Sequence, residues 1–87
     1  MPFFSTVVSI TPADTWVKVA SNVTFGVIEV INQVVEYACT HRDAAGPAPT
    51  DRDDAVDLEG YREINNDAGI DVYVMAIGGV GEVKVSL

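Results

Sequence analysis

The residues of this chain with the clearest potential for chemistry are aspartates within residues 41–57, HRDAAGPAPTDRDDAVD. Four of them lie close together in the sequence: Asp51, Asp53, Asp54 and Asp57. Carboxylate oxygens are the ligands that calcium prefers, but an EF-hand loop beginning at Asp51 needs glycine at its sixth position and glutamate at its twelfth. The sequence has Val56 and Arg62 there, so the motif is not met. The nearby prolines and small residues favour a long solvated loop over residues 42–57, with weak calcium binding as the alternative.

Cys39 and His41 are the only cysteine and histidine, and they lie two positions apart in a run typical of a strand. A structural zinc site needs four ligands and a catalytic zinc site three, so this pair does not predict a metal centre. No evident pocket or oxyanion donor accompanies the pair for nucleophilic catalysis. We therefore expect Cys39 to be a small buried hydrophobic side chain, and the sequence predicts neither an enzyme nor a cofactor.

The aromatic residues suggest a surface that binds without chemistry. Trp16, Tyr37, Tyr61 and Tyr73 are the types of side chain on which sugar rings stack. Trp16 lies next to a turn and shares its run with Val17, so an anchor in the core or in an interface is the favoured interpretation. Carbohydrate binding remains the alternative.

The segments that must position these residues have the composition of strands. Apolar residues alternate with polar ones in short runs that are rich in β-branched side chains. These runs cover residues 5–10, 15–20, 23–31, 34–41, 70–77 and 81–87, whereas the segment LEGYREI, residues 58–64, contains a polar bend around Gly60. We therefore predict an all-β fold, a small antiparallel β-sandwich or jelly-roll-like barrel of about seven short strands with one long acidic loop.

Three details of this pattern concern the connections between strands. Residues 23–38 also show a helical spacing of apolar side chains, although dense β-branching and Gly26 favour strands. Asn32 and Gln33 stand between two β-rich runs and predict a tight hairpin turn. The cluster NNDAG, residues 65–69, predicts a second turn, because asparagine and glycine accept positive φ angles.

Length and charge restrict the classes of partner. One domain, residues 1–87, accounts for the chain, and the core of so short a domain is thin. Thirteen acidic residues against five basic ones give a net charge of -8, which repels phosphate backbones and anionic lipid head groups. No run approaches the ~20 apolar residues of a membrane span, and the beginning MPFFSTVVSI lacks the basic region of a signal peptide. We expect neither nucleic acid nor a membrane as a partner, and synthesis in a reducing cytoplasm.

Apolar side chains exceed what a thin core needs, since 48% of the residues are hydrophobic. In the run 70–77 one face carries Tyr73, Met75 and Ile77, which is unlike a solvated face. This pattern indicates a contact between subunits, in which Trp16 is a further anchor.

The beginning of the chain is the second part of the predicted interface. Phe3 and Phe4 precede the first firm turn, in a segment too apolar to extend alone into water. We expect residues 1–10 to form an arm that adds a strand to a neighbouring protein.

Five features follow one another over residues 15–87: TWVKV, TFGVIEVI, a proline-containing loop, LEGYREI and the terminal DVYVMAIGGVGEVKVSL. This order resembles the small β-sandwich virion proteins of tailed bacteriophages. The matching residues are Trp16, Val72, Tyr73, Ala76, Gly78, Gly79, Val83 and Val85. The acidic loop at residues 42–57 has no counterpart in that pattern.

The resemblance implies a non-catalytic protein of the capsid surface, made in the host cytoplasm. Such proteins are similar to capsid decoration (cement) proteins, which bind and stabilise the assembled capsid and are often trimeric. The implied partners are the major capsid protein or another virion protein, and further copies of the chain. A fibre or spike-base domain, a carbohydrate-binding module, and a cytoplasmic adaptor or toxin-neutralising protein remain as alternatives.

Overall fold

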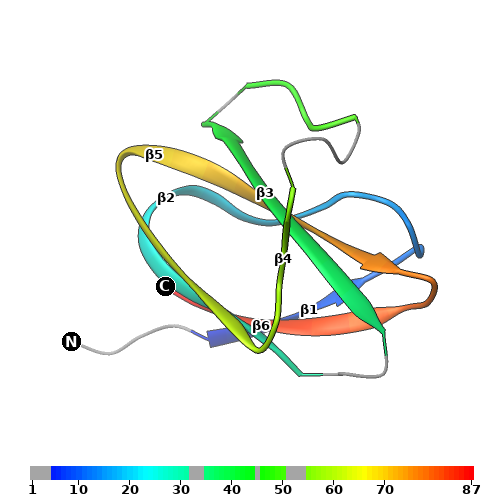
Figure 1. Ribbon diagram of the computed structural model, residues 1–87. Helices are drawn as coiled ribbons and strands as arrows, with labels where there is room; N and C mark the ends of the chain where they lie inside the picture. Colours follow the sequence, from blue (N-terminus) through cyan, green and yellow to red (C-terminus); the bar gives the residue numbers. More distant parts are fainter. Residues whose placement is uncertain (1–4, 32–34, 45, 51–54) are drawn as a thin grey trace.

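The computed structural model describes residues 5–31, 35–44, 46–50 and 55–87. Within these residues the chain is all-β, with strands β1 (Ser5–Ile10), β2 (Val17–Val30), β3 (Glu36–Asp43), β4 (Val56–Asp57), β5 (Tyr61–Ile77) and β6 (Gly81–Ser86). The strands form one antiparallel sheet in the order β1-β6-β2-β5-β3-β4 (Figure 1). The prediction of an all-β fold is confirmed. The helical alternative for residues 23–38 is wrong for the described part of that range.

Strands β2 and β5 are long because each continues through a position that resembles a turn in the sequence. These positions are Asn22 in β2 and Gly69 in β5, and the chain bends there without ending the strand. The two strands pair with each other, and their register shifts around Asn22, which has a φ of 51°. Gly69, with a φ of 75°, lies beside it, and a Cβ added to Gly69 would stand 2.5 Å from Asn22 Oδ1. The NNDAG cluster therefore bends β5 and does not end it, so the turn predicted at residues 65–69 is wrong.

The bends divide the sheet into two leaves that face each other. The β3 leaf consists of β3, β4, residues 17–23 of β2 and residues 70–77 of β5; the β6 leaf consists of β1, β6, residues 25–30 of β2 and residues 61–65 of β5. A hydrogen bond joins the leaves where β3 meets β6, because the backbone N–H of Glu82 donates to the Tyr37 hydroxyl at 3.1 Å. The ring of Tyr37 packs so closely on Gly81 that any side chain at Gly81 would overlap it.

The order of the strands in the sheet differs from their order in the sequence. Strands β2 and β3 are not neighbours, because β5 lies between them, so the hairpin predicted at Asn32 and Gln33 is wrong. Those two residues themselves lie outside the described residues. Strands β5 and β6 are likewise separated by β2. A central strand must pair along both edges, and the long strands β2 and β5 occupy these positions in place of the sequential neighbours.

The core lies between the two leaves. Ile10, Ile28, Val74 and Val83 are completely buried, one from each of β1, β2, β5 and β6. Cys39 is a free, buried cysteine that belongs to the same cluster, as the sequence predicts. Alternation in β6 is also confirmed, since Val83 and Val85 are buried while Glu82 and Lys84 are exposed.

Candidate functional site

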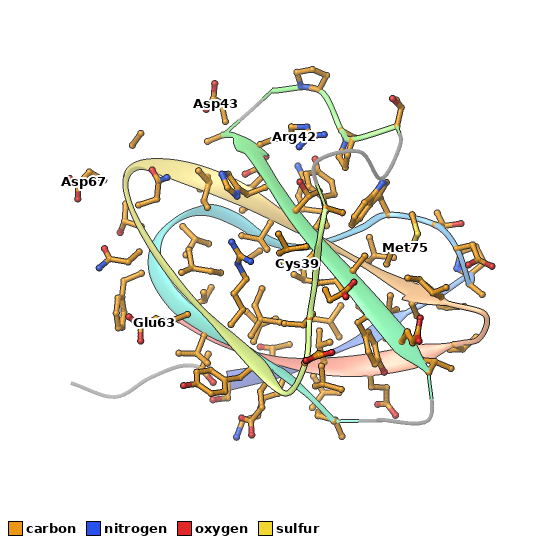
Figure 2. The ribbon with its side chains drawn as sticks, in the orientation of Figure 1. Cys39, Arg42, Asp43, Glu63, Asp67 and Met75 are labelled. Atoms are coloured by element: carbon orange, nitrogen blue, oxygen red, sulfur yellow. The ribbon has the colours of Figure 1, made fainter. Side chains whose placement is uncertain are left out.

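The face of β5 that the sequence predicts as a subunit contact is buried within the chain. Tyr73 is 4% exposed and Met75 is 6% exposed, so the expectation of an open apolar face at these two residues is wrong. The physical reason is that other parts of the same chain cover these two side chains. The Lys18 ammonium from β2 lies 5.8 Å from the centre of the Tyr73 ring. Figure 2 labels Met75 near the end of β5.

The other predicted interface residues are placed differently. Ile77 at the end of β5 and Trp16 just before β2 are both partly buried. Phe3 and Phe4 lie outside the described residues. Residues 5–10 of the predicted arm form β1 and pair with β6 of the same sheet, so this part of the segment is not a free arm.

Asp71 forms the strongest polar cluster, which sequence reasoning missed. Its side chain is 1% exposed and its Oδ1 accepts hydrogen bonds from the backbone N–H of Asn22 at 2.8 Å and the Ser21 hydroxyl at 3.1 Å. Lys18 Nζ lies 3.3 Å from Oδ2. The Asn22 hydrogen bond is the main cause that lowers the pKa of Asp71, and the hydrogen bond to Asp71 is the main cause that raises the pKa of Lys18. The cluster holds the bend of β2, and its signal in the sequence is one aspartate between apolar strand residues.

Cys39 and His41 line a small cavity of about 110 Å³, together with Arg62 from the first part of β5. The expectation that no pocket accompanies this pair is therefore wrong. Burial raises the pKa of the Cys39 thiol, and the charge of Arg62 acts in the opposite direction. A thiol with a raised pKa forms little thiolate and is a weak nucleophile. The shift of the Cys39 pKa therefore runs opposite to the shift that activates a cysteine nucleophile.

The aspartates proposed as calcium ligands are only partly described. Asp51, Asp53 and Asp54 lie outside the described residues, whereas Asp57 is exposed in β4. Among the described residues, no group of three or more His, Cys, Asp or Glu side chains is placed to hold a metal ion. Asp57 instead belongs to a groove at the β4 edge of the sheet.

This groove, which we call the acidic groove, has a volume of about 290 Å³. Its described lining residues are Val30, Val35, Glu36, Tyr37, Asp57, Leu58, Glu59 and Gly60. Val30, Tyr37 and Leu58 are buried and form an apolar floor, whereas the three carboxylate residues are exposed and form the rim. Sequence reasoning missed the groove because its residues come from three separate segments of the chain.

Backbone hydrogen bonds fix the position of the segment that forms one side of the acidic groove. The N–H of Leu58 donates to the carbonyl oxygen of Tyr37 at 3.0 Å, and the N–H of Val30 donates to the carbonyl oxygen of Gly60 at 2.7 Å. Residues 58–60 are thereby tied to β3 on one side and to the end of β2 on the other. The floor of the groove is held by the fold itself.

The opposite edge of the sheet is β1. Within the described strands, β1 pairs with β6 alone, so its second edge has no strand partner. Residues 1–13 contain no Asp, Glu, Lys or Arg in a chain of net charge -8. Val7 on this strand is 54% exposed. Natural sheets usually protect an open edge with charge, proline or shortness, and β1 has none of the three.

Comparison with known proteins adds no relative. A scan against models of protein families, a search of curated proteins and a search of solved structures each found no match. Within the described residues there is no helix that is long and apolar enough to span a bilayer.

Proposed function

We propose that this chain is a non-catalytic structural protein of a tailed-bacteriophage virion, a decoration protein that binds the assembled capsid and stabilises it. The resemblance over residues 15–87 supports this proposal. The open, uncharged edge of β1 is the observation that carries it, because such an edge is suited to attachment to another protein. The capsid surface is the proposed location, and the major capsid protein or another virion protein is the proposed partner.

Attachment through β1 is a main-chain interaction. An extended segment of the capsid subunit aligns with β1, and the free N–H and C=O groups of the edge form hydrogen bonds with it. Residues 5–10 carry no charged side chain, so this edge does not itself repel an acidic segment, although the net charge of the chain is -8. An edge of six residues gives a modest contact, which repetition over a symmetric capsid strengthens through avidity.

Exposed side chains next to β1 extend the same contact surface. The strand register places Val7 opposite Lys84, Lys84 opposite Glu29 and Glu29 opposite Tyr61, in a row across four strands. Val7 is 54% exposed and Tyr61 is 67% exposed. A capsid strand added at β1 would continue the sheet that carries this row.

The direct test is binding to purified capsids of the phage that encodes the chain, measured by co-sedimentation. Val7→Lys places a charge on the β1 edge, and we expect it to weaken binding roughly tenfold, equal to about 1.4 kcal/mol. Val80→Lys is the matched control, because Val80 is also 54% exposed but lies between β5 and β6 and not on an edge. If V7K binds as well as V80K and the unchanged chain, attachment through β1 is wrong. If the unchanged chain does not sediment with capsids, the virion proposal is wrong.

Trimer formation is a separate part of the proposal. Light scattering on a sizing column would give about 28 kDa for a trimer, three times the 9.3 kDa of one chain. We expect the trimer mass with and without chelator. A monomer in both buffers would contradict the trimer but not attachment of single chains to the capsid.

A further inference from the structure

The acidic groove has an imbalance of charge that indicates the kind of ligand it accepts. Glu36, Asp57 and Glu59 are the charged side chains among its described lining residues, and none of these lining residues is basic. All three carboxylate residues are exposed at the rim, where a ligand can reach them without crossing the core. A cation is therefore the complementary charge.

The floor of the acidic groove is apolar, so a complementary ligand needs an apolar part as well as a positive charge. Leu58 and Tyr37 are each 4% exposed and Val30 is 8% exposed, so the base of the groove is an apolar surface fixed within the fold. The carboxylates do not form a group that could hold a metal ion in common. A ligand with an apolar body and a cationic end fits this arrangement better than a compact ion does.

The groove also lies beside an open main-chain edge. Strand β4 (Val56–Asp57) is last in the sheet order, and within the described strands it pairs with β3 alone. Asp57 belongs both to this edge and to the groove rim. An extended peptide can thus hydrogen-bond along β4 while one of its side chains enters the groove, which a free small cation cannot do.

We propose that the acidic groove binds a basic, extended segment of a partner protein, with a Lys or Arg side chain in the groove. The aliphatic stem of that side chain packs on Leu58 and Val30, and its cationic head contacts the rim carboxylates. This site is separate from the β1 edge and does not depend on the proposed capsid role. Failure of either proposal leaves the other intact.

The test uses the isotope-labelled full chain and synthetic peptides, followed by nuclear magnetic resonance. The probe is acetyl-Leu-Arg-Leu-Arg-Leu-amide, and the matched controls are acetyl-Leu-Glu-Leu-Glu-Leu-amide, spermidine and calcium chloride. We expect the arginine peptide to shift the amide signals of residues 35–37 and 57–60, and to bind more weakly as salt concentration rises. We expect the glutamate peptide to produce no such shifts.

Two variants localise the interaction. Asp57→Asn combined with Glu59→Gln is expected to weaken peptide affinity about two- to fivefold for each carboxylate removed, the range of exposed ion pairs. The control Glu82→Gln combined with Glu63→Gln changes the net charge equally at exposed positions outside the groove, and is expected to leave the affinity unchanged. If both double variants weaken peptide affinity equally, the affinity depends on the net charge of the chain and not on the groove, and the proposal is wrong.

The remaining outcomes identify other occupants. Binding of spermidine with the affinity of the arginine peptide would show a site for small cations and overturn the protein partner. Calcium-dependent shifts at residues 57–60 of equal strength would replace the peptide with a metal ion. Peptide-induced shifts confined to β1 and β6 would place the peptide site at the other edge and overturn the groove.

Discussion

Strand β5 passes through two different environments, and the difference between its two parts explains much of this molecule. In residues 61–65, β5 pairs with β2 and alternates between exposed and buried side chains, with Tyr61 67% exposed. In residues 70–76, it lies between β2 and β3 and every residue is buried. The first part is a one-sided strand, and the second is a strand covered on both faces.

The second part of β5 has an apolar outer face that is buried within the chain. Tyr73 and Met75 point away from the core cluster and are nevertheless buried by the same chain. Asp71 on the same part is buried too, with its charge met by Lys18. An apolar outer face in a sequence pattern thus identifies a strand whose two faces are both buried. In this chain, other parts of the same chain bury the outer face.

Met75→Ala is expected to lower the free energy of unfolding by about 2 to 5 kcal/mol, the usual cost of removing a buried methionine side chain. Tyr61→Ala in the one-sided part is expected to change it by less than about 0.5 kcal/mol, because most of that ring is already in water. Urea unfolding followed by circular dichroism measures both. The loss for Met75→Ala should be the same at low and high protein concentration, because Met75 is buried within one chain.

A different result would revise the comparison. If Met75→Ala leaves the unfolding of a dilute monomer unchanged but weakens association between chains, the outer face of β5 is open in solution. The contact between subunits would then be the correct interpretation of Tyr73 and Met75.

Gly69 separates the two parts of β5, and Gly69→Ala is the next largest expected effect. It should cost about 2 to 3 kcal/mol, because the backbone has a positive φ and the new Cβ meets Asn22 Oδ1. Gly60→Ala is the matched control: Gly60 has a φ of 80°, but a Cβ there meets nothing within 4 Å. We expect Gly60→Ala to cost only the backbone penalty of about 1 to 2 kcal/mol. Equal losses in thermal unfolding would show that the contact with Asn22 does not hold the bend.

The same comparison shows how far the sequence alone predicts this fold. Alternation in residues 81–87 and the buried position of Cys39 follow from local pattern, because side chains in a strand point to opposite faces in turn. Strand order does not follow, because pairing depends on contacts between distant segments. The insertion of β5 between β2 and β3 is the clearest case, since the residues at 32 and 33 suggested a hairpin.

The candidate sites were harder to predict than the fold. The acidic groove joins the end of β2, the beginning of β3 and residues 57–60, and nothing in any one segment indicates the other two. Asp71 stands at a position where the alternation of a strand allows an exposed polar residue, so the sequence does not indicate that Asp71 is buried. The β1 edge was partly predictable, because the lack of charge in residues 1–13 is a property of the sequence.

The smallest expected effect concerns pH and the buried carboxylate of β5. Because its folded pKa is lowered from the ordinary 3.8, Asp71 contributes stability above that value and loses it as the pH falls through the lowered pKa. Asp71→Asn keeps an acceptor for Asn22 but removes the charge that faces Lys18, a partner that is 45% exposed and thus screened by water. We expect a modest loss of stability at neutral pH and a shallower decline of unfolding free energy below about pH 4.

Asp67→Asn is the control, since Asp67 is an exposed aspartate on the same strand and lies at the outside of the bend in Figure 2. It removes the same charge at an exposed position, so it should change the free energy of unfolding at neutral pH by less than about 0.5 kcal/mol. If Asp71→Asn also retains the full acid decline, other carboxylates cause it, and the Asp71 cluster holds the bend of β2 by hydrogen-bond geometry and not by charge.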